Sequence, residues 1–178
     1  GTITNTGRTV RVLPVKEQAT VNISAATVKQ YQEEPDSLEK RIKDMPLQIA
    51  CAMLNSRLSR IAQQSDSPFN GASVGSEVIF NTADAFSLSV SAAPDKWQGA
   101  LSRAEQELRK AIQYGFEAHE FTEILSGIAS DLTHSIETWE SVPADAMASH
   151  LINAVGDKLV HTSPQEDMRV FQIAVQLI

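Results

Sequence analysis

The chain has 178 residues, of which 42% are apolar and 21% are charged, so it is long and apolar enough to fold around its own core. Lys and Arg number 15 against 22 Asp and Glu, which gives a net charge of −7. Because the balance is acidic and no basic run occurs, the composition argues against binding to nucleic acid or to an anionic membrane surface. The single cysteine excludes a disulfide framework and a cysteine-based zinc site within this chain, and no apolar stretch approaches the roughly 20 residues of a membrane span.

The two ends of the chain differ in character. Residues 1–18 are polar and rich in turns, with a short extended run at residues 9–13, and we expect them to lead into a core of residues 19–161. The chain stops in an apolar run at residues 170–178, whereas native termini are usually polar. Two interpretations stay open. The chain is a single domain excised from a longer protein, with residues 162–178 as a truncated C-terminal helix, or it is a complete small protein whose last helix docks on the core.

The first elements in chain order are a strand and a long helix. Apolar and polar residues alternate over residues 19–28, which predicts a strand. Asp36 or Ser37 can cap the helix that follows, in which apolar residues recur at helical spacing as far as Ile61. Because Pro46 lies within this helix, we expect a kink or a restart there.

Two further strands follow a polar loop at residues 63–71. Alternation over residues 72–80 and again over residues 86–92 predicts a hairpin with one wet and one buried face, which is typical of an antiparallel sheet. Three or four such strands cannot bury both of their faces, so helices must cover one of them. The sequence therefore predicts an α+β fold, a two-layer sandwich of a mainly antiparallel sheet with helices packed on one face.

The rest of the chain is predicted to be helical. One helix begins at Pro94–Asp95 and ends at Gly115, which suits the residue just beyond a helix. Its expected buried side consists of Trp97, Leu101, Ala104, Leu108 and Ile112. Further helices are predicted from about Glu117 to the break at Val142–Pro143, from about Ala144, and from about Pro164.

Two segments come close to zinc-peptidase motifs without completing them. In His-Glu-x-x-His, two imidazoles one helical turn apart bind the metal while the glutamate activates water. Residues 119–123 carry Glu123 in place of the second histidine, and residues 134–138 match the inverted motif except at Thr138. Because each segment lacks an imidazole, we interpret both as solvated helix faces and predict no metal site. A self-contained hydrolase that uses His119 and Glu120 is the weaker alternative.

The loop before the first hairpin strand is the most distinctive feature of the sequence. It presents Phe69 between Pro68 and Asn70. An exposed aromatic ring on a loop favours binding, but the ring can equally pack beneath the preceding helix, and the residues leave both possibilities open. Cys51 lies inside an apolar helix and is predicted to be an unreactive core thiol.

Several segments taken together resemble the repeated domains of the insulinase/pitrilysin family of zinc peptidases. In chain order they are Met53–Leu58, Pro68–Ala72, Ala85–Leu88 and Arg109–Glu117 with Glu120 beyond, and the similarity covers about residues 19–161. In this family the first domain holds zinc through His-x-x-Glu-His, on the helix before the first hairpin, and a distant Glu. The later domains lack these ligands and help to close the chamber that binds the peptide.

The resemblance implies a non-catalytic domain, because neither incomplete motif lies on the helix before the hairpin. It implies a structural and substrate-chamber role in a zinc metalloendopeptidase, most similar to the domain that follows the catalytic one in bacterial periplasmic members. No cofactor is expected in this chain, with zinc in the catalytic domain of the parent protein, where zinc-activated water would attack the peptide carbonyl. The implied partners are the other domains of the parent and its peptide substrate, with no nucleic acid and no membrane, and the implied location is the periplasm.

The resemblance also implies a set of substrate contacts. Some family members hold the substrate with an Arg and a Tyr, and the nearest positions here are Arg57 or Arg60 and Phe69, which lacks the tyrosine hydroxyl. With Asn70, these are the expected contacts on the inner surface. The alternative function, from a different class, is a free-standing α+β module that binds a peptide or protein by strand addition at a sheet edge or through the Phe69 loop.

Overall fold

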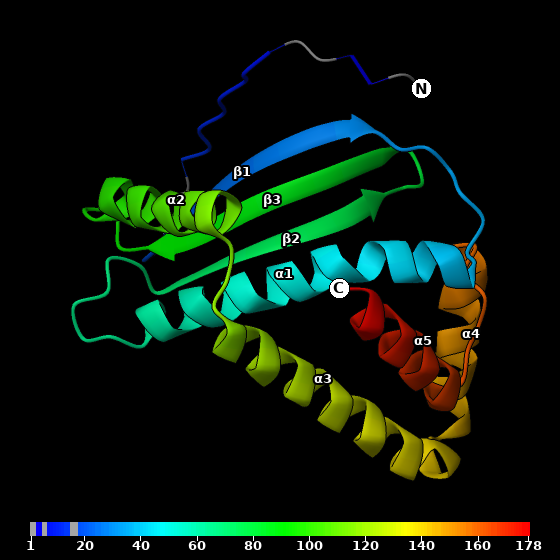
Figure 1. Ribbon diagram of the computed structural model, residues 1–178. Helices are drawn as coiled ribbons and strands as arrows, with labels where there is room; N and C mark the ends of the chain where they lie inside the picture. The colour runs from blue at the N-terminus through cyan, green and yellow to red at the C-terminus, as the bar shows by residue number, and fades with distance from the viewer. Residues whose placement is uncertain (1–2, 5–6, 15–17) are drawn as a thin grey trace. The chain divides into compact units, whose positions relative to one another are not determined.

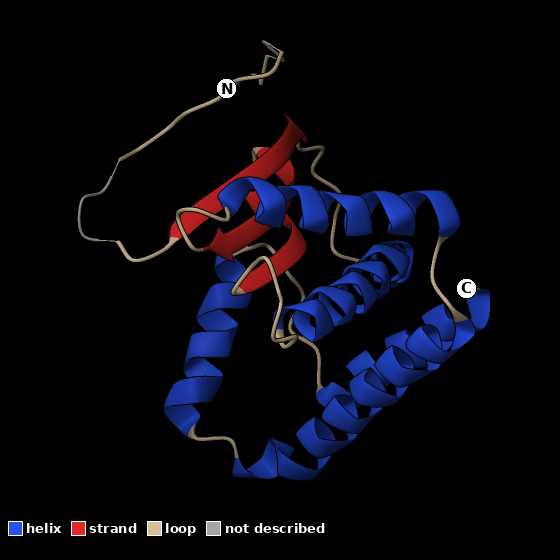
Figure 2. Cartoon of the chain, turned by 90° about the vertical axis from the view of Figure 1, so that its left-hand side faces the viewer, coloured by secondary structure: helices blue, strands red, loops and turns tan. Residues whose placement is uncertain are grey.

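The computed structural model describes residues 3–4, 7–14 and 18–178. Its elements, in chain order, are β1 (Val21–Gln30), α1 (Leu38–Ala62), β2 (Gly71–Ile79), β3 (Ala83–Ala92), α2 (Trp97–Tyr114), α3 (Ala118–Thr138), the 3-10 helix η1 (Trp139–Ser141), α4 (Ala144–Gly156) and α5 (Pro164–Leu177) (Figure 1). The predicted α+β class is confirmed, and the three strands gather in one sheet (red in Figure 2). The predicted lead-in falls partly on residues 1–2, 5–6 and 15–17, which lie outside the described residues.

The chain groups into two compact units. Residues 1–32 and 51–116 form what we call the sheet unit, and residues 33–50 and 117–178 form the helical unit. The division falls inside α1, between Ala50 and Cys51. The single domain with a core of residues 19–161 stays a prediction, because compact units within one chain do not by themselves decide where a domain ends.

The sheet is antiparallel with the strand order β1-β3-β2. Residues that pair across neighbouring strands share a face of the sheet. One row therefore joins Ala25, Leu88 and Val74, and the adjacent row on the other face joins Ser24, Ser89 and Ser73. At these rows the alternation that predicted the strands separates an apolar face, which the helices cover, from a face of serines.

The core of the sheet unit lies between the apolar sheet face, α2 and the second half of α1. Leu58 and Ala92 are fully buried, and Phe69 keeps only 2% of its surface exposed. The cluster consists of Leu54, Leu58, Ile61, Phe69, Val74, Leu88, Val90, Ala92, Ala100 and Ala104. Burying these side chains supplies the main stabilisation of the unit, at about 1.5–3 kcal/mol for each large apolar side chain.

Helix α1 passes through Pro46 without a break, so the predicted restart is wrong. A proline inside a helix removes one backbone hydrogen bond, and burial of Ile49 in the next turn at 1% exposure offsets that loss. Of the two predicted caps, Ser37 is the one observed, because its Oγ accepts a hydrogen bond from the Lys40 N–H at 3.2 Å. Asp36 pairs with Arg41 instead.

The buried side of α2 agrees with the prediction in part, since Ala104 is buried and Leu101 and Leu108 pack against the core. Ala100, Ala104 and Glu107 are buried, whereas Trp97 is 40% exposed and Ile112 is 78% exposed. Alanines allow the helix backbone to approach the sheet closely, so the helix is rotated toward its alanine stripe and the longest side chains lie at the margin. The buried Glu107 carboxylate is paired with Arg103 and Lys110, each at 3.0 Å.

The remaining helix boundaries are as predicted to within a few residues. Gly115 follows α2 with a φ of +73°, which favours glycine. Glu117 begins α3 with a capping box that includes Glu120, and Ser163 begins α5 in the same way. Within the described residues, no helix is both long enough and apolar enough to cross a membrane.

Candidate functional site

The loop between α1 and β2 is fixed by Phe69. The ring is buried at 2% exposure, and a tight turn holds its backbone, in which the Ser67 Oγ donates to the Phe69 carbonyl oxygen at 2.7 Å and accepts from the Phe69 N–H at 3.3 Å. The two possibilities left open for Phe69 are thereby resolved. The ring packs as a core side chain, which is the second of the two possibilities, since the turn directs the side chain inward.

Asn70 and Arg60 are the surface residues among the expected contacts. Arg60 lies in the last turn of α1 and is exposed. Asn70 is exposed directly before β2, and its N–H donates to the Ser91 carbonyl oxygen at 2.8 Å. Because Phe69 anchors the loop between them, both residues are held by buried neighbours while their side chains reach solvent. They provide a cation and an amide for contact with a polypeptide backbone or an acidic group.

Arg57 is half-buried and already contacts the turn that joins α2 to α3. Its Nη2 donates to the Gly115 carbonyl oxygen at 3.2 Å, and its guanidinium lies 4.6 Å from the centroid of the Phe116 ring. A cation over an aromatic face is stabilising by about 0.5–2 kcal/mol, depending on how far it is desolvated. The structure therefore gives Arg57 a role in the architecture of the sheet unit, and a contact between Arg57 and substrate stays a prediction.

Asn55 is a residue to which the sequence analysis assigned no role. Its Nδ2 donates to the Val74 carbonyl oxygen at 3.0 Å, and its Oδ1 accepts from the Val74 N–H at 2.8 Å. Both backbone groups of a strand residue point to the same side of the strand, so Asn55 engages β2 on the side away from β3. The available signal was its place in the segment Met53–Leu58, which carried part of the family resemblance.

The residues that resembled a zinc motif are engaged in starting α3. The Glu120 carboxylate is buried and accepts from the Glu117 N–H at 2.9 Å. The His119 Nδ1 lies 3.2 Å from Glu117, and both side chains are largely exposed. Within the part of the chain that the structure describes, no three His, Cys, Asp or Glu side chains are grouped so that they could hold a metal ion. His119 and Glu120 do not supply the set of donors that a zinc centre requires.

The only cysteine is half-buried in α1. Burial raises the pKa of the Cys51 thiol, which keeps it in the protonated, weakly nucleophilic form. This agrees with the interpretation of Cys51 as an unreactive thiol.

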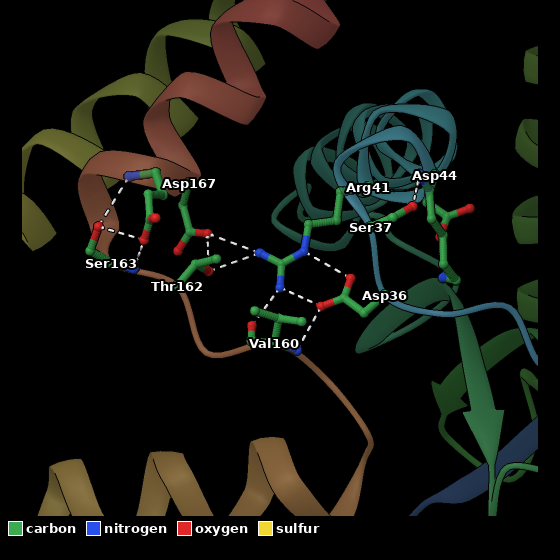
Figure 3. A network of polar contacts seen from close by, with 10 residues as sticks. Asp36, Ser37, Arg41, Asp44, Val160, Thr162, Ser163 and Asp167 are labelled. Atoms are coloured by element: carbon green, nitrogen blue, oxygen red, sulfur yellow. Dashed lines mark hydrogen bonds and ion pairs between the residues drawn. The ribbon is translucent and has the colours of Figure 1, made fainter.

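The most connected polar group of the helical unit is Arg41 (Figure 3). Its guanidinium binds both carboxylate oxygens of Asp36, at 2.9 and 2.5 Å, and also donates to the Thr162 Oγ1 at 2.8 Å and to the Val160 carbonyl oxygen at 2.7 Å. The hydrogen bond from Arg41 lowers the pKa of Asp36, whose side chain is only 5% exposed. Arg41 also lies 3.4 Å from the Asp167 carboxylate. The network joins the start of α1 to the segment before α5, and because its donors and acceptors bind one another we assign it to stability rather than to chemistry.

A pocket of about 850 Å³, partly open to solvent, is lined by residues of the helical unit, including Asp36 and Arg41. Its lining combines apolar side chains such as Leu132, Trp139 and Phe171 with His150 and His161. The Trp139 and His161 rings are stacked, with their centroids 5.9 Å apart.

The elements define a class of protein, namely two-layer α+β domains in which a strand and a helix precede a hairpin and further helices. No protein-family model and no curated protein matches the chain. Among solved structures, the periplasmic protease PqqL from Escherichia coli matches with a TM-score of 0.79 and 19% identity, over 96% of this chain and 20% of that chain. A predicted insulinase family protease from Yersinia pestis matches with a TM-score of 0.74 and 10% identity, over 92% of this chain and 35% of that chain.

A third solved structure, the ferredoxin protease FusC in complex with Arabidopsis ferredoxin, matches with a TM-score of 0.63 and 15% identity, over 93% of this chain and 18% of that chain. At these identities the likeness concerns the fold, which is that of a domain found in insulinase-type proteases. The resemblance that the sequence indicated is confirmed at this level. The chain spans about a fifth to a third of the lengths of the solved proteins that it matches.

Proposed function

We propose that the chain is a non-catalytic domain of a zinc metallopeptidase of the insulinase type, in which it forms part of the wall of the peptide-binding chamber. The observation that carries the proposal is the composition of α1, the helix before the β2–β3 hairpin. This helix contains no histidine, although the domain has the fold of insulinase-type proteases over nearly its whole length. In the family, the metal-binding domain keeps both of its imidazoles on this helix.

The proposal divides the work between domains. Another domain of the parent protein supplies the zinc ion and the glutamate that activates water, and this chain supplies surface and shape. The solved proteases, of which this fold occupies 18–35%, support such a division. A periplasmic location belongs to the same proposal, because one of these proteases, PqqL, is periplasmic. The proposed partners are the remaining domains and the peptide substrate, without nucleic acid or membrane.

Within the proposed chamber wall, Arg60 and Asn70 contact the substrate directly. Arg57 and Phe69 act beneath them, since Arg57 holds the turn after α2 and Phe69 anchors the loop. In the parent peptidase, Arg60→Ala or Asn70→Ala should raise KM severalfold and leave kcat unchanged. Each side chain is expected to bind the substrate equally well in the ground state and in the transition state, so its loss weakens binding without affecting the chemical step. A fall in kcat with unchanged KM would contradict the assignment.

A zinc titration of the purified chain tests the absence of catalytic machinery. Isothermal titration should show no one-to-one site with a Kd below about 1 µM, whereas a His-rich site in the parent protein should bind one ion per chain. A stoichiometric site that disappears in His119→Ala or His134→Ala would overturn the proposal. The reading frame upstream of the chain provides an independent test, because the proposal requires a domain with His-x-x-Glu-His.

The second candidate is a binding module without catalytic activity that adds a peptide strand to its sheet. The supporting observation is that β1 is an edge strand of ten residues, most of them exposed. The outer side of β2 is less suited, because Asn55 engages Val74 there. A peptide that binds by strand addition should protect alternate β1 amides from hydrogen exchange, and start and stop codons that directly flank this chain would favour the module over the peptidase domain.

A further inference from the structure

Helix α4 is the least buried of the helices that the structure describes. None of its thirteen residues is buried. Four apolar residues, Ala148, Leu151, Ile152 and Val155, follow the i, i+3, i+4, i+7 spacing that places them on one side of a helix. We call them the α4 stripe, and within it Leu151 is 43%, Ile152 71% and Val155 78% exposed.

The opposite side of α4 is not buried either, so packing there does not stabilise the helix. His150, which is exposed, and Ala154, which is half-buried, line the partly open pocket of the helical unit. An isolated helix of this length is marginal in water, since helices depend on tertiary packing for most of their stability. The stripe must therefore be covered for α4 to be stable.

The composition of α4 indicates what kind of surface covers it. Its charged residue is Asp145, in the first turn and outside the stripe, and it carries no Lys or Arg. Few charges and several exposed aliphatic side chains are typical of the buried centre of a protein interface, whereas its rim is polar. The partner surface is therefore expected to be apolar.

We infer that the α4 stripe packs against another domain of the same polypeptide, beyond these 178 residues. This inference rests on the proposed function. Its support is that solved chains with this fold continue well beyond it, since the matched region is 20% of PqqL and 18% of FusC. Four side chains are too few for a dimer, which needs about 1,200 Å² of buried surface. A covalently linked domain needs far less area, because its effective concentration is in the millimolar range.

The test places a photo-crosslinking amino acid, p-benzoylphenylalanine, at position 152 in the complete native gene. After irradiation, mass spectrometry of the digested protein should identify crosslinks to peptides of the same polypeptide outside these 178 residues. Position 112 on α2 is the matched control, since Ile112 is 78% exposed but belongs to the sheet unit. Crosslinks from position 152 to a second copy, to another protein or to this chain's own 178 residues would overturn the inference, as would no crosslink.

A second measurement uses Val155→Asp and its control Ile112→Asp, two substitutions at equally exposed positions. Substitutions at exposed positions seldom affect folding, so both variants should fold. In the full-length protein, Val155→Asp should raise the rate of proteolysis around residues 157–163 about tenfold, because α4 loses its cover. Equal rates for the two variants would contradict the inference.

The two proposals fail in different ways. If the crosslinked region lies in the same polypeptide but belongs to a domain of another class, the α4 surface is established and the peptidase proposal fails. If a peptidase domain with His-x-x-Glu-His is present and position 152 gives no crosslink to the rest of that polypeptide, the peptidase proposal stands and the α4 surface fails.

Discussion

The side-chain amide of Asn55 forms two hydrogen bonds with the backbone of Val74, as a neighbouring strand would. The donor and acceptor distances are 3.0 and 2.8 Å, and the two residues lie 19 positions apart in the chain. An exposed strand edge is a template for unwanted pairing, and proteins protect such edges with helices or side chains. Asn55 links α1 to β2, and it also occupies the outer edge of β2 at Val74.

Asn55→Ala should lower the free energy of unfolding by about 1–3 kcal/mol, because two backbone groups of a buried residue lose their partners. Urea unfolding at pH 7 measures the change. Asn55→Asp is the matched control, since it keeps the acceptor for the Val74 N–H but places a second oxygen against the carbonyl. An unchanged midpoint in Asn55→Ala would show that water replaces the amide without cost.

The Arg41–Asp36 pair predicts a loss of stability in acid. Arg41 lowers the pKa of Asp36 in the folded protein, so the unfolded chain takes up a proton at a higher pH than the folded chain does. The stabilisation is complete above the unfolded pKa of about 4 and is lost as the pH falls through the lower folded pKa.

Asp36→Asn should remove this dependence and lower stability at pH 7 by about 1–3 kcal/mol, because a charged hydrogen-bond partner of Arg41 is lost. Urea midpoints at pH 7 and pH 3 for both proteins measure the effect. The exposed Glu166 also has a lowered pKa, through its hydrogen bonds with Ser163, and Glu166→Gln serves as the control for other acid-sensitive groups. Equal losses in the wild type and in Asp36→Asn would contradict the prediction.

Phe69 and Asn70 are neighbours in the sequence with opposite exposure. Phe69→Ala should cost about 3–5 kcal/mol, because it empties a core position. Asn70→Ala should change stability by less than about 0.5 kcal/mol, since its side chain is exposed. Thermal unfolding of the two variants measures this difference. If Phe69→Ala and Asn70→Ala lose similar amounts of stability, the loop conformation rather than burial of the ring stabilises this region.

Gly115 should not tolerate a side chain. Its φ of +73° and ψ of −147° lie in a region that is nearly restricted to glycine, although an added Cβ would contact nothing within 4 Å. Gly115→Ala should therefore cost about 1–3 kcal/mol through backbone strain alone.

Gly127→Ala is the matched control for this substitution. Gly127 lies inside α3, also with nothing within 4 Å of an added Cβ, and alanine there should stabilise the protein by about 0.5–1 kcal/mol. Urea unfolding should give opposite signs for the two variants. The same sign in both would show that the conformation at Gly115 is not strained.

The sequence alone determined most of the elements of the fold, since their signals are local. Alternation over residues 86–92 predicts β3, and Gly115 and Pro164 predict where one helix ends and another begins. Each of these signals depends on residues a few positions apart, and their period distinguishes a half-buried strand from an amphipathic helix.

Local sequence signals were misleading at two places where packing opposed the local preference. Pro46 predicted a kink or a restart, and α1 continues through it without a restart. The predicted buried side of α2 included Trp97 and Ile112, which are exposed, whereas Ala104 of the same set is buried together with Ala100. In both cases packing outweighed the local preference, because the energy of burial is shared among many contacts that no short window of sequence contains.

Only the tertiary structure decided the roles of the candidate site residues. Arg57 contacts a carbonyl oxygen 58 positions away, and Arg41 contacts a hydroxyl 121 positions away. Whether Phe69 points outward or inward likewise depended on the core that its neighbours build. A sequence records which groups can donate, accept or pack, but the partner of each group is chosen by folding, which brings distant segments together and leaves only some side chains in contact with water.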